Sequence, residues 1–307
     1  MHSPIETAVL ATLCARALTF AAIALGLVSA LLCAPARADW EVSASAGAFY
    51  DHNLTRAQDA VDKRAAGAGV VNVNATHFVP LTGSDGVTFT VNGRGEVFDR
   101  YSGLSNLVIG GGVAYRHKFG LGYLAPWLAL SVGASYDDYR EDLRTSSRLA
   151  VRVETGKRFT EQFDASLGLF YERRFDNHGE SIVPGIPGNV FDLAGQGAFV
   201  RAGYAPTDAL SLDARAGVRR GDVESTAQQS LPIFLASSAI TEDPVWGDPN
   251  LYAYRLRGTT WSGTLGANYA LSDQASLDLA YHYDFTRAAQ GLDYTTNLII
   301  LTFVYRF

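Results

Sequence analysis

The chain has 307 residues, is 48% hydrophobic and carries a formal net charge of −6 at pH 7. This acidic balance, with no basic tail, argues against a nucleic-acid partner. Both cysteines, Cys14 and Cys33, lie within the first 38 residues, so the rest of the chain has no thiol chemistry and needs no disulfide framework.

Residues 1–38 are predicted to be a secretory signal peptide. An apolar stretch runs from Ala17 to Ala34, and Ala36-Arg37-Ala38 follows as a small-x-small cleavage pattern. The alternative is a permanent transmembrane helix, since an apolar run of roughly 18 residues can span a bilayer. Pro35 and the cleavage pattern favour the signal. We therefore expect one domain over residues 39–307.

This domain divides into about twelve short segments in which apolar and polar residues alternate, each as long as a tilted membrane strand. In 275–285, for example, Leu279 and Tyr281 alternate with Asp278 and His282. The predicted strands are 40–50, 69–79, 87–100, 106–118, 124–136, 147–157, 163–174, 191–204, 209–220, 252–269, 275–285 and 294–307. The pattern predicts an all-β fold, a transmembrane up-and-down antiparallel β-barrel of about 12 strands, and hence the outer membrane as its location.

The connections between these segments alternate in length, as in outer-membrane barrels with short periplasmic turns and long outer loops. The short turns are 83–86, 119–122, 158–161, 206–208 and 272–274. The outer connections are 51–66, 101–105, 137–146, 175–190, 221–250 and 286–293, of which only 101–105 is short.

Aromatic residues recur near the predicted strand ends, where they would form two interfacial girdles. They are Trp40, Tyr50, Trp127, Tyr136, Tyr204, Tyr254, Tyr269, Tyr281, Tyr283, Tyr305 and Phe307. The alternative explanation is the ordinary preference of aromatic residues for strands.

The last strand ends on a terminal aromatic, with Phe303, Tyr305 and Phe307 on one face. It resembles the C-terminal signal of bacterial outer-membrane β-barrels, which implies recognition by the barrel-assembly machinery. These three residues are therefore predicted to be an assembly signal.

The alternation also predicts which charged side chains face the lumen. The inward set is Arg94, Glu96, Arg116, Lys118, Arg152, Glu154, Asp164, Glu172, Asp213, Arg215, Arg219, Asp278, His282 and Asp284. These charges could pair and brace a narrow interior, or they could line a wet pore. Twelve strands lie between barrels filled by side chains and those with an open channel.

The longest loop, 221–250, is acidic, with no Lys or Arg, and contains the apolar run Leu231-Pro-Ile-Phe-Leu-Ala236. We expect 231–240 to fold into the barrel mouth as a constriction, with Leu231, Ile233, Phe234 and Leu235 as its residues. Alternatively, this segment packs on neighbouring loops or is partly helical.

In 252–269 the alternation puts Arg255 and Arg257 outward near the outer end, where guanidinium groups could meet lipopolysaccharide phosphates. A β-bulge that resets the register would turn them inward instead.

The sequence offers little support for an enzyme. It has no Gly-x-Ser-x-Gly elbow, and His77, His117, His178 and His282 have no obvious serine partner at cross-strand distance. No cofactor or metal site is indicated.

The first strand ends in Ala48-Phe-Tyr-Asp-His-Asn-Leu-Thr-Arg56. This Tyr-Asp-x-Asn pattern resembles porin-like outer-membrane families of Gram-negative bacteria and, more distantly, the barrel part of surface lipoprotein assembly modifiers. The second resemblance implies lipoprotein export, but those proteins carry a helical-repeat domain before the barrel, whereas here Asp39 leads directly into the first strand.

The function expected from the sequence is a porin-like channel for passive diffusion of small polar solutes, in contact with outer-membrane lipids and lipopolysaccharide. The alternatives are a non-conducting surface-binding or scaffold barrel that acts through its long outer loops, and a barrel-embedded lipid-modifying enzyme.

Overall fold

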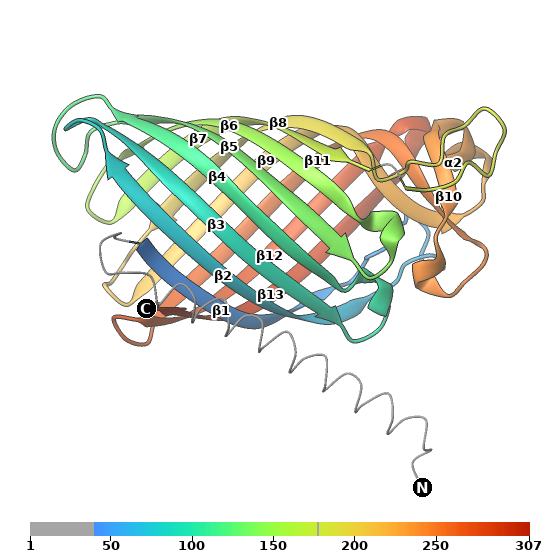
Figure 1. Ribbon diagram of the computed structural model, residues 1–307, viewed down its shortest axis with the longest axis horizontal. Coiled ribbons are helices and arrows are strands. Elements are labelled where there is room, and N and C mark those ends of the chain that lie inside the picture. The colour runs from blue at the N-terminus through green and yellow to red at the C-terminus, as the bar shows by residue number, and fades with distance from the viewer. Residues whose placement is uncertain (1–39, 177) are drawn as a thin grey trace, which may run out of the picture. The chain divides into compact units, whose positions relative to one another are not determined.

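The described residues form one antiparallel sheet that closes on itself (Figure 1). The structure is a computed structural model that describes residues 40–176 and 178–307. The predicted signal peptide, 1–38, lies outside these residues. No helix in the described part of the chain is long and apolar enough to cross a membrane.

The strands follow one another around the sheet in chain order with a single exception, β10. Their bounds are β1 (Trp40–Asp51), β2 (Ala66–Pro80), β3 (Asp85–Phe98), β4 (Asn106–Lys118), β5 (Trp127–Tyr139), β6 (Ser146–Arg158), β7 (Phe163–Phe175), β8 (Leu193–Tyr204), β9 (Leu210–Gln228), β10 (Ser237–Glu242), β11 (Leu251–Ala270), β12 (Ala275–Ala288) and β13 (Asp293–Arg306). The outer connections also hold the helix α2 (Leu231–Ala236) and the 3-10 turns η1 (Ser102–Leu104), η2 (Asp142–Arg144), η3 (Pro244–Trp246) and η4 (Ala289–Gly291).

The ring closes where the first strand meets the last. β1 pairs antiparallel with β13, from Ser43 opposite Arg306 to Asp51 opposite Leu298. β9 pairs directly with β11, so β10 stands outside the ring, and twelve of the described strands form the barrel. Closure leaves no strand edge in the hydrocarbon, where an unpaired backbone group would cost several kcal/mol. The predicted twelve-stranded barrel is confirmed.

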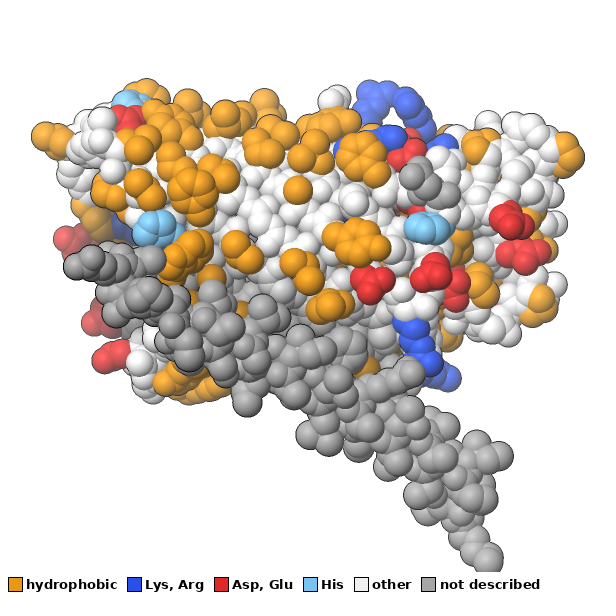
Figure 2. Space-filling model, viewed as in Figure 1, with side chains coloured by type: hydrophobic (Ala, Val, Ile, Leu, Met, Phe, Trp, Pro, Cys, Tyr) orange, Lys and Arg blue, Asp and Glu red, His pale blue; other side chains and the backbone are white. Residues whose placement is uncertain are grey.

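The two faces of each strand meet different surroundings. On β3, Phe89 and Val91 lie on the exposed outer face, while Thr90 and Asn92 lie on the inner face. Figure 2 shows the same division for one side of the barrel, with hydrophobic side chains over its middle and charged ones gathered toward its two ends. This apolar belt is the surface that a lipid bilayer requires.

Most strand bounds agree with the sequence to within about three residues, but β9 does not. It runs on to Gln228, eight residues beyond the predicted end at 220. The extension pairs with β11 beyond the apolar belt, and its Val223 and Ala227 are covered by α2 and β10. The predicted loop 221–250 is thus largely ordered, and its middle forms α2 and β10.

Two of the predicted girdle aromatics lie elsewhere. Trp127 is on the inner face, where the guanidinium of Arg116 lies 4.4 Å from its ring centroid. Tyr254 is 1% exposed, because β10 and α2 pack around it. The remaining strand-end aromatics are exposed on the outer face, among them Tyr50, Tyr136 and Tyr204.

Candidate functional site

The candidate site is the lumen, and the pairing registers place the predicted pore-lining residues on its wall. These residues are Arg94, Glu96, Arg116, Arg152, Glu154, Asp164, Glu172, Asp213, Arg215, Asp278, His282 and Asp284, and each lies on the face opposite the apolar belt. They do not converge on one point. Within a strand, Arg94 forms an ion pair with Glu96 and His282 with Asp284.

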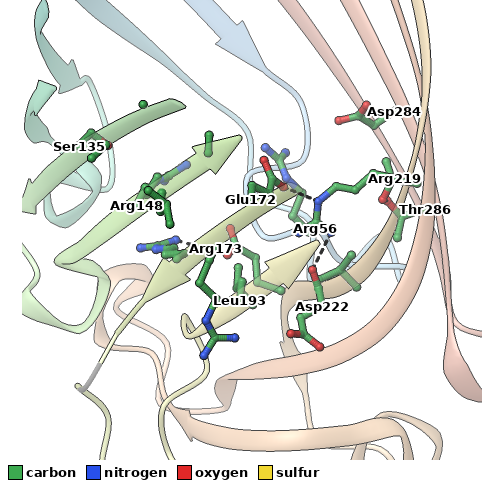
Figure 3. Close-up of a pocket in the computed structure, with 18 of the residues that line it drawn as sticks. Arg56, Ser135, Arg148, Glu172, Arg173, Leu193, Arg219, Asp222, Asp284 and Thr286 are labelled. Carbon is green, nitrogen blue, oxygen red and sulfur yellow. Dashed lines mark hydrogen bonds and ion pairs between the residues drawn. The ribbon is translucent and has the colours of Figure 1, made fainter. Parts of the chain in front are cut away.

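A cavity of about 570 Å³ with several charged residues on its wall lies in the outer part of the lumen (Figure 3). Arg219 lies on its wall, with Nε 2.5 Å from Glu172 Oε1, and it also donates a hydrogen bond to the backbone oxygen of Asp222. Arg56 donates to Asp51 at 2.8 Å, and Arg148 pairs with Asp137. The arginines of this outer cavity are therefore held by carboxylates.

A second cavity, of about 320 Å³, continues into the middle of the lumen and shares Asn92, Ala150 and Glu172 with the first. Its wall includes Arg152 and Phe170. A third space, of about 130 Å³, shares Arg56, Arg174 and Glu224 with the outer cavity. The three cavities thus adjoin one another, and each has charged residues on its wall.

Two of three further lumen arginines lie against Phe199, which is 5% exposed. The guanidinium carbon of Arg215 lies 4.2 Å from the ring centroid and that of Arg152 lies 5.4 Å from it. Arg201 on β8 is directly opposite Arg215 on β9. Of the described residues, no carboxylate forms an ion pair with Arg152, Arg201 or Arg215.

The outer mouth is bridged by what we call the outer cap, made of loops 52–65, 140–145 and 178–192 and of residues 222–256. Thr226, near the end of β9, donates its backbone N–H to the backbone oxygen of Thr55 after β1. Ile240 of β10 donates to the oxygen of Pro187 after β7. The first contact joins connections that are not neighbours in the ring, and the second joins neighbouring ones.

The centre of the cap is the pair Arg144 and Asp243, which are 8% and 0% exposed in their side chains. Thr226 Oγ1 and Trp246 Nε1 also donate to the Asp243 carboxylate, each at 2.8 Å. Arg144 stacks on Phe191, 4.5 Å from the ring centroid. Thr226 and Trp246 belong to the same segment as Asp243, 222–256, whereas Arg144 comes from loop 140–145.

The pKa values of this pair follow from burial and mutual attraction. Burial by itself raises the pKa of Asp243, but the charge of Arg144 and the hydrogen bonds from Arg144, Thr226 and Trp246 hold it below its ordinary value. Burial by itself lowers the pKa of Arg144, and Asp243 outweighs that effect and raises it. Both groups therefore stay charged at neutral pH.

The four residues predicted to form a constriction lie on α2, at the end of the barrel that carries the long loops (Figure 1). Ile233 is 4% exposed and packs in a cluster with Val223, Tyr254 and Leu256. Leu231, Phe234 and Leu235 are exposed. None of the four lines the three lumen cavities of the described chain. The apolar run is instead accommodated by packing on the extended β9–β11 hairpin, and the cap bridges the mouth.

The sequence left open whether Arg255 and Arg257 point outward or into the lumen. In the structure both side chains lie outside the lumen. Arg257 is 86% exposed in its side chain. Arg255 donates to the backbone oxygens of Asn189 and Asp192 in the outer loop after β7.

The predicted assembly-signal residues lie on the outer face of β13. Phe303, Tyr305 and Phe307 are all exposed, and the rings of Tyr305 and Phe307 are 5.1 Å apart. The backbone N–H of Phe307 donates to Val42 of β1, so the terminal residue contributes to closure of the barrel.

The histidine best placed for chemistry is His282, inside the lumen. Its Nδ1 lies 2.8 Å from Thr264 Oγ1, and its Nε2 lies 3.0 Å from Asp284 Oδ1. His117 pairs with Asp85, and His178 with Asp176 in an outer loop.

Several functional residues escaped the sequence reasoning. Arg148 and Arg174 lie at the same alternating positions of β6 and β7 as Arg152 and Glu172, so the sequence pattern could have predicted that they face the lumen. Arg201 could have been found in the same way on β8. Arg56 lies in a connection, and Glu224 lies in the part of β9 that the sequence had assigned to a loop.

Comparisons with known proteins agree with this architecture. No family model matches the chain, and no curated protein matches it. A solved outer membrane channel from Pseudomonas putida F1 superposes with a TM-score of 0.54 at 13% identity, over 87% of this chain and 96% of that one. The NanC porin gives a TM-score of 0.46 at 6% identity, over 86% and 100% of the two chains. The outer membrane channel DcaP of Acinetobacter baumannii gives 0.38 at 9% identity, over 89% and 99%.

At these identities the likeness concerns the fold. A closed ring with an apolar belt and a polar interior is the arrangement that a lipid bilayer requires of a strand-built protein. The chain therefore has the fold of an outer-membrane β-barrel.

Proposed function

We propose that the protein is a channel for passive diffusion of small polar solutes across the outer membrane. The observation that carries this proposal is the series of adjoining cavities in the outer and middle lumen, which have volumes of about 570, 320 and 130 Å³ and charged residues on their walls. A barrel braced only by paired charges would not need spaces of this size. Charged walls on both sides of such spaces favour water and polar solutes.

We also propose how this protein reaches the outer membrane and which lipids it contacts there. Residues 1–38 would be removed on export, the terminal aromatics would be read by the assembly machinery, and exposed Arg257 would contact lipopolysaccharide phosphates.

Planar-bilayer recording of the refolded chain tests the channel. We expect discrete conductance steps in KCl. A chain that is folded, as judged by circular dichroism and heat-modifiable gel migration, but adds no conductance would refute the proposal.

A second candidate function is a non-conducting barrel that binds or scaffolds at the cell surface. The observation that favours it is the outer cap, because the buried Arg144–Asp243 pair joins the connection between β5 and β6 to the one between β9 and β11. Conductance that appears only after the cap is loosened would support this candidate.

A further inference from the structure

Arg152, Arg201 and Arg215 differ from the other arginines of the upper lumen. In the outer cavity, Arg56, Arg148 and Arg219 each have a carboxylate partner. In the described chain, Arg152, Arg201 and Arg215 have none. Arg152 and Arg215 both lie against the ring of Phe199, and Arg201 is opposite Arg215, so these three arginines are neighbours in the lumen wall.

Their arrangement is electrostatically unfavourable in isolation. Arg201 and Arg215 occupy directly opposite positions on neighbouring strands, where like charges destabilise a sheet. The positive charges of Arg152 and Arg201 both act on Arg215, against the single negative charge of Glu154. The cluster thus has a local excess of positive charge.

Phe199 holds these side chains without neutralising them. Its ring accepts the guanidinium faces of Arg215 at 4.2 Å and Arg152 at 5.4 Å, an attraction that uses the face of each group. The N–H donors at the guanidinium edges stay available, and these edges form paired hydrogen bonds with carboxylates and phosphates. Arg152 and Arg201 are exposed on the lumen face, so a solute in the channel can reach them.

We propose that Arg152, Arg201 and Arg215 form an anion-binding site in the lumen, and that this site makes the channel select small solutes carrying a carboxylate or a phosphate group. The selectivity rests on the proposed channel function, whereas anion binding at the three arginines does not. A bound anion would supply the negative charge that the wall lacks at this point. Phe199 is the positioning residue, because it sets the direction of two of the three guanidinium groups.

Two measurements on the refolded full barrel test the proposal. The first is the reversal potential across a planar bilayer in a KCl gradient. The second is calorimetric titration with inorganic phosphate and with acetate, and glycerol is the neutral control. The test variant combines Arg201→Gln with Arg215→Gln. The control is Arg220→Gln, which removes one arginine from the outer face of β9. Arg201→Lys with Arg215→Lys keeps the charge and shows whether the guanidinium fork is required.

We expect the wild type to pass chloride in preference to potassium and to bind both anions. The glutamine pair should weaken anion binding about tenfold, which corresponds to about 1.4 kcal/mol, and should shift the reversal potential toward cation preference. The lysine pair should retain part of the binding, and Arg220→Gln should behave as wild type. Binding of phosphate without acetate, or the reverse, would identify the anionic group.

The possible failures are distinguishable. If the barrel conducts but shows neither anion preference nor anion binding, the anion-binding site is refuted and the channel function still holds. If the barrel does not conduct but binds anions, and the glutamine pair loses this binding, the channel function is refuted and the anion-binding site still holds. Equal binding by the wild type and the folded glutamine pair overturns the site in either case.

Discussion

Arg144 and Asp243, 99 residues apart in the chain, form a two-pronged ion pair in the outer cap. Nη1 donates to Oδ1 at 2.8 Å and Nη2 donates to Oδ2 at 2.7 Å. Arg144 follows β5, and Asp243 lies between β10 and β11, so the pair joins loops that leave the ring on different sides. This contact makes the outer cap a single packed unit.

Asp243→Asn is expected to loosen the cap, because it leaves the Arg144 charge buried without a counter-charge. Breaking such a pair costs about 3–5 kcal/mol. Conductance should rise and the segment between β9 and β11 should become sensitive to protease. The matched control is Asp248→Asn, whose ion pair with Arg64 is partly exposed at 3.3 Å and contributes at most about 1 kcal/mol. Equal effects of the two substitutions would contradict the assigned role of the buried pair.

The cap should also open in acid, and the direction follows from the lowered pKa of Asp243. A carboxylate whose pKa is lower in the folded state stabilises that state above its unfolded pKa of about 3.9. This stabilisation is lost as the pH falls through the lower folded value. Conductance recorded against pH should therefore stay constant from neutral pH to about pH 4 and rise only below it. Asp243→Asn should remove this rise, and a rise at mildly acidic pH would contradict the assignment.

Ile233 anchors α2 to the extended hairpin, so Ile233→Ala is expected to detach the helix. Truncating a buried isoleucine costs about 2–5 kcal/mol. Leu235, on the same helix and 61% exposed, is the control, and its truncation should change stability by no more than about 0.5 kcal/mol. Urea unfolding in lipid vesicles and limited proteolysis at α2 measure the difference. Similar results for both variants would show that α2 is not held through Ile233.

Deletion of Phe307 is expected to reduce assembly more than stability. The residue makes one backbone hydrogen bond to Val42 and one ring contact with Tyr305, so its loss from the folded barrel should cost about 1 kcal/mol. Outer-membrane levels should nevertheless fall strongly, while Phe307→Tyr should keep them. Equal levels of the deletion and the wild type in membrane fractions would refute the assembly-signal prediction.

The barrel itself could be predicted from the sequence because its main constraint is local. In a membrane strand each side chain faces either lipid or the lumen, so an apolar and a polar residue alternate whatever the neighbouring strand contains. That rule located β4 at its observed bounds, 106–118, and placed Arg152 and Arg215 on the lumen wall. The rule weakens where the lipid ends, and there the predicted end of β9 fell short.

The outer cap could not be predicted in this way, because its order comes from contacts between segments with no period. Nothing in the residues around Asp243 indicates Arg144 as its partner, and the apolar run of α2 is compatible with a constriction, a loop contact or a helix. Whether a lumen arginine is paired also depends on side chains from other strands: Arg219 meets Glu172, whereas Arg201 meets Arg215.

The sequence alone thus determined the class, the strand number and the two faces of the wall, since the bilayer imposes them on every strand separately. Only the tertiary structure decided how the mouth is bridged and where positive charge is left uncompensated. Those properties belong to pairs of residues that are far apart in the chain, and they exist only once the ring has closed and brought the pairs together.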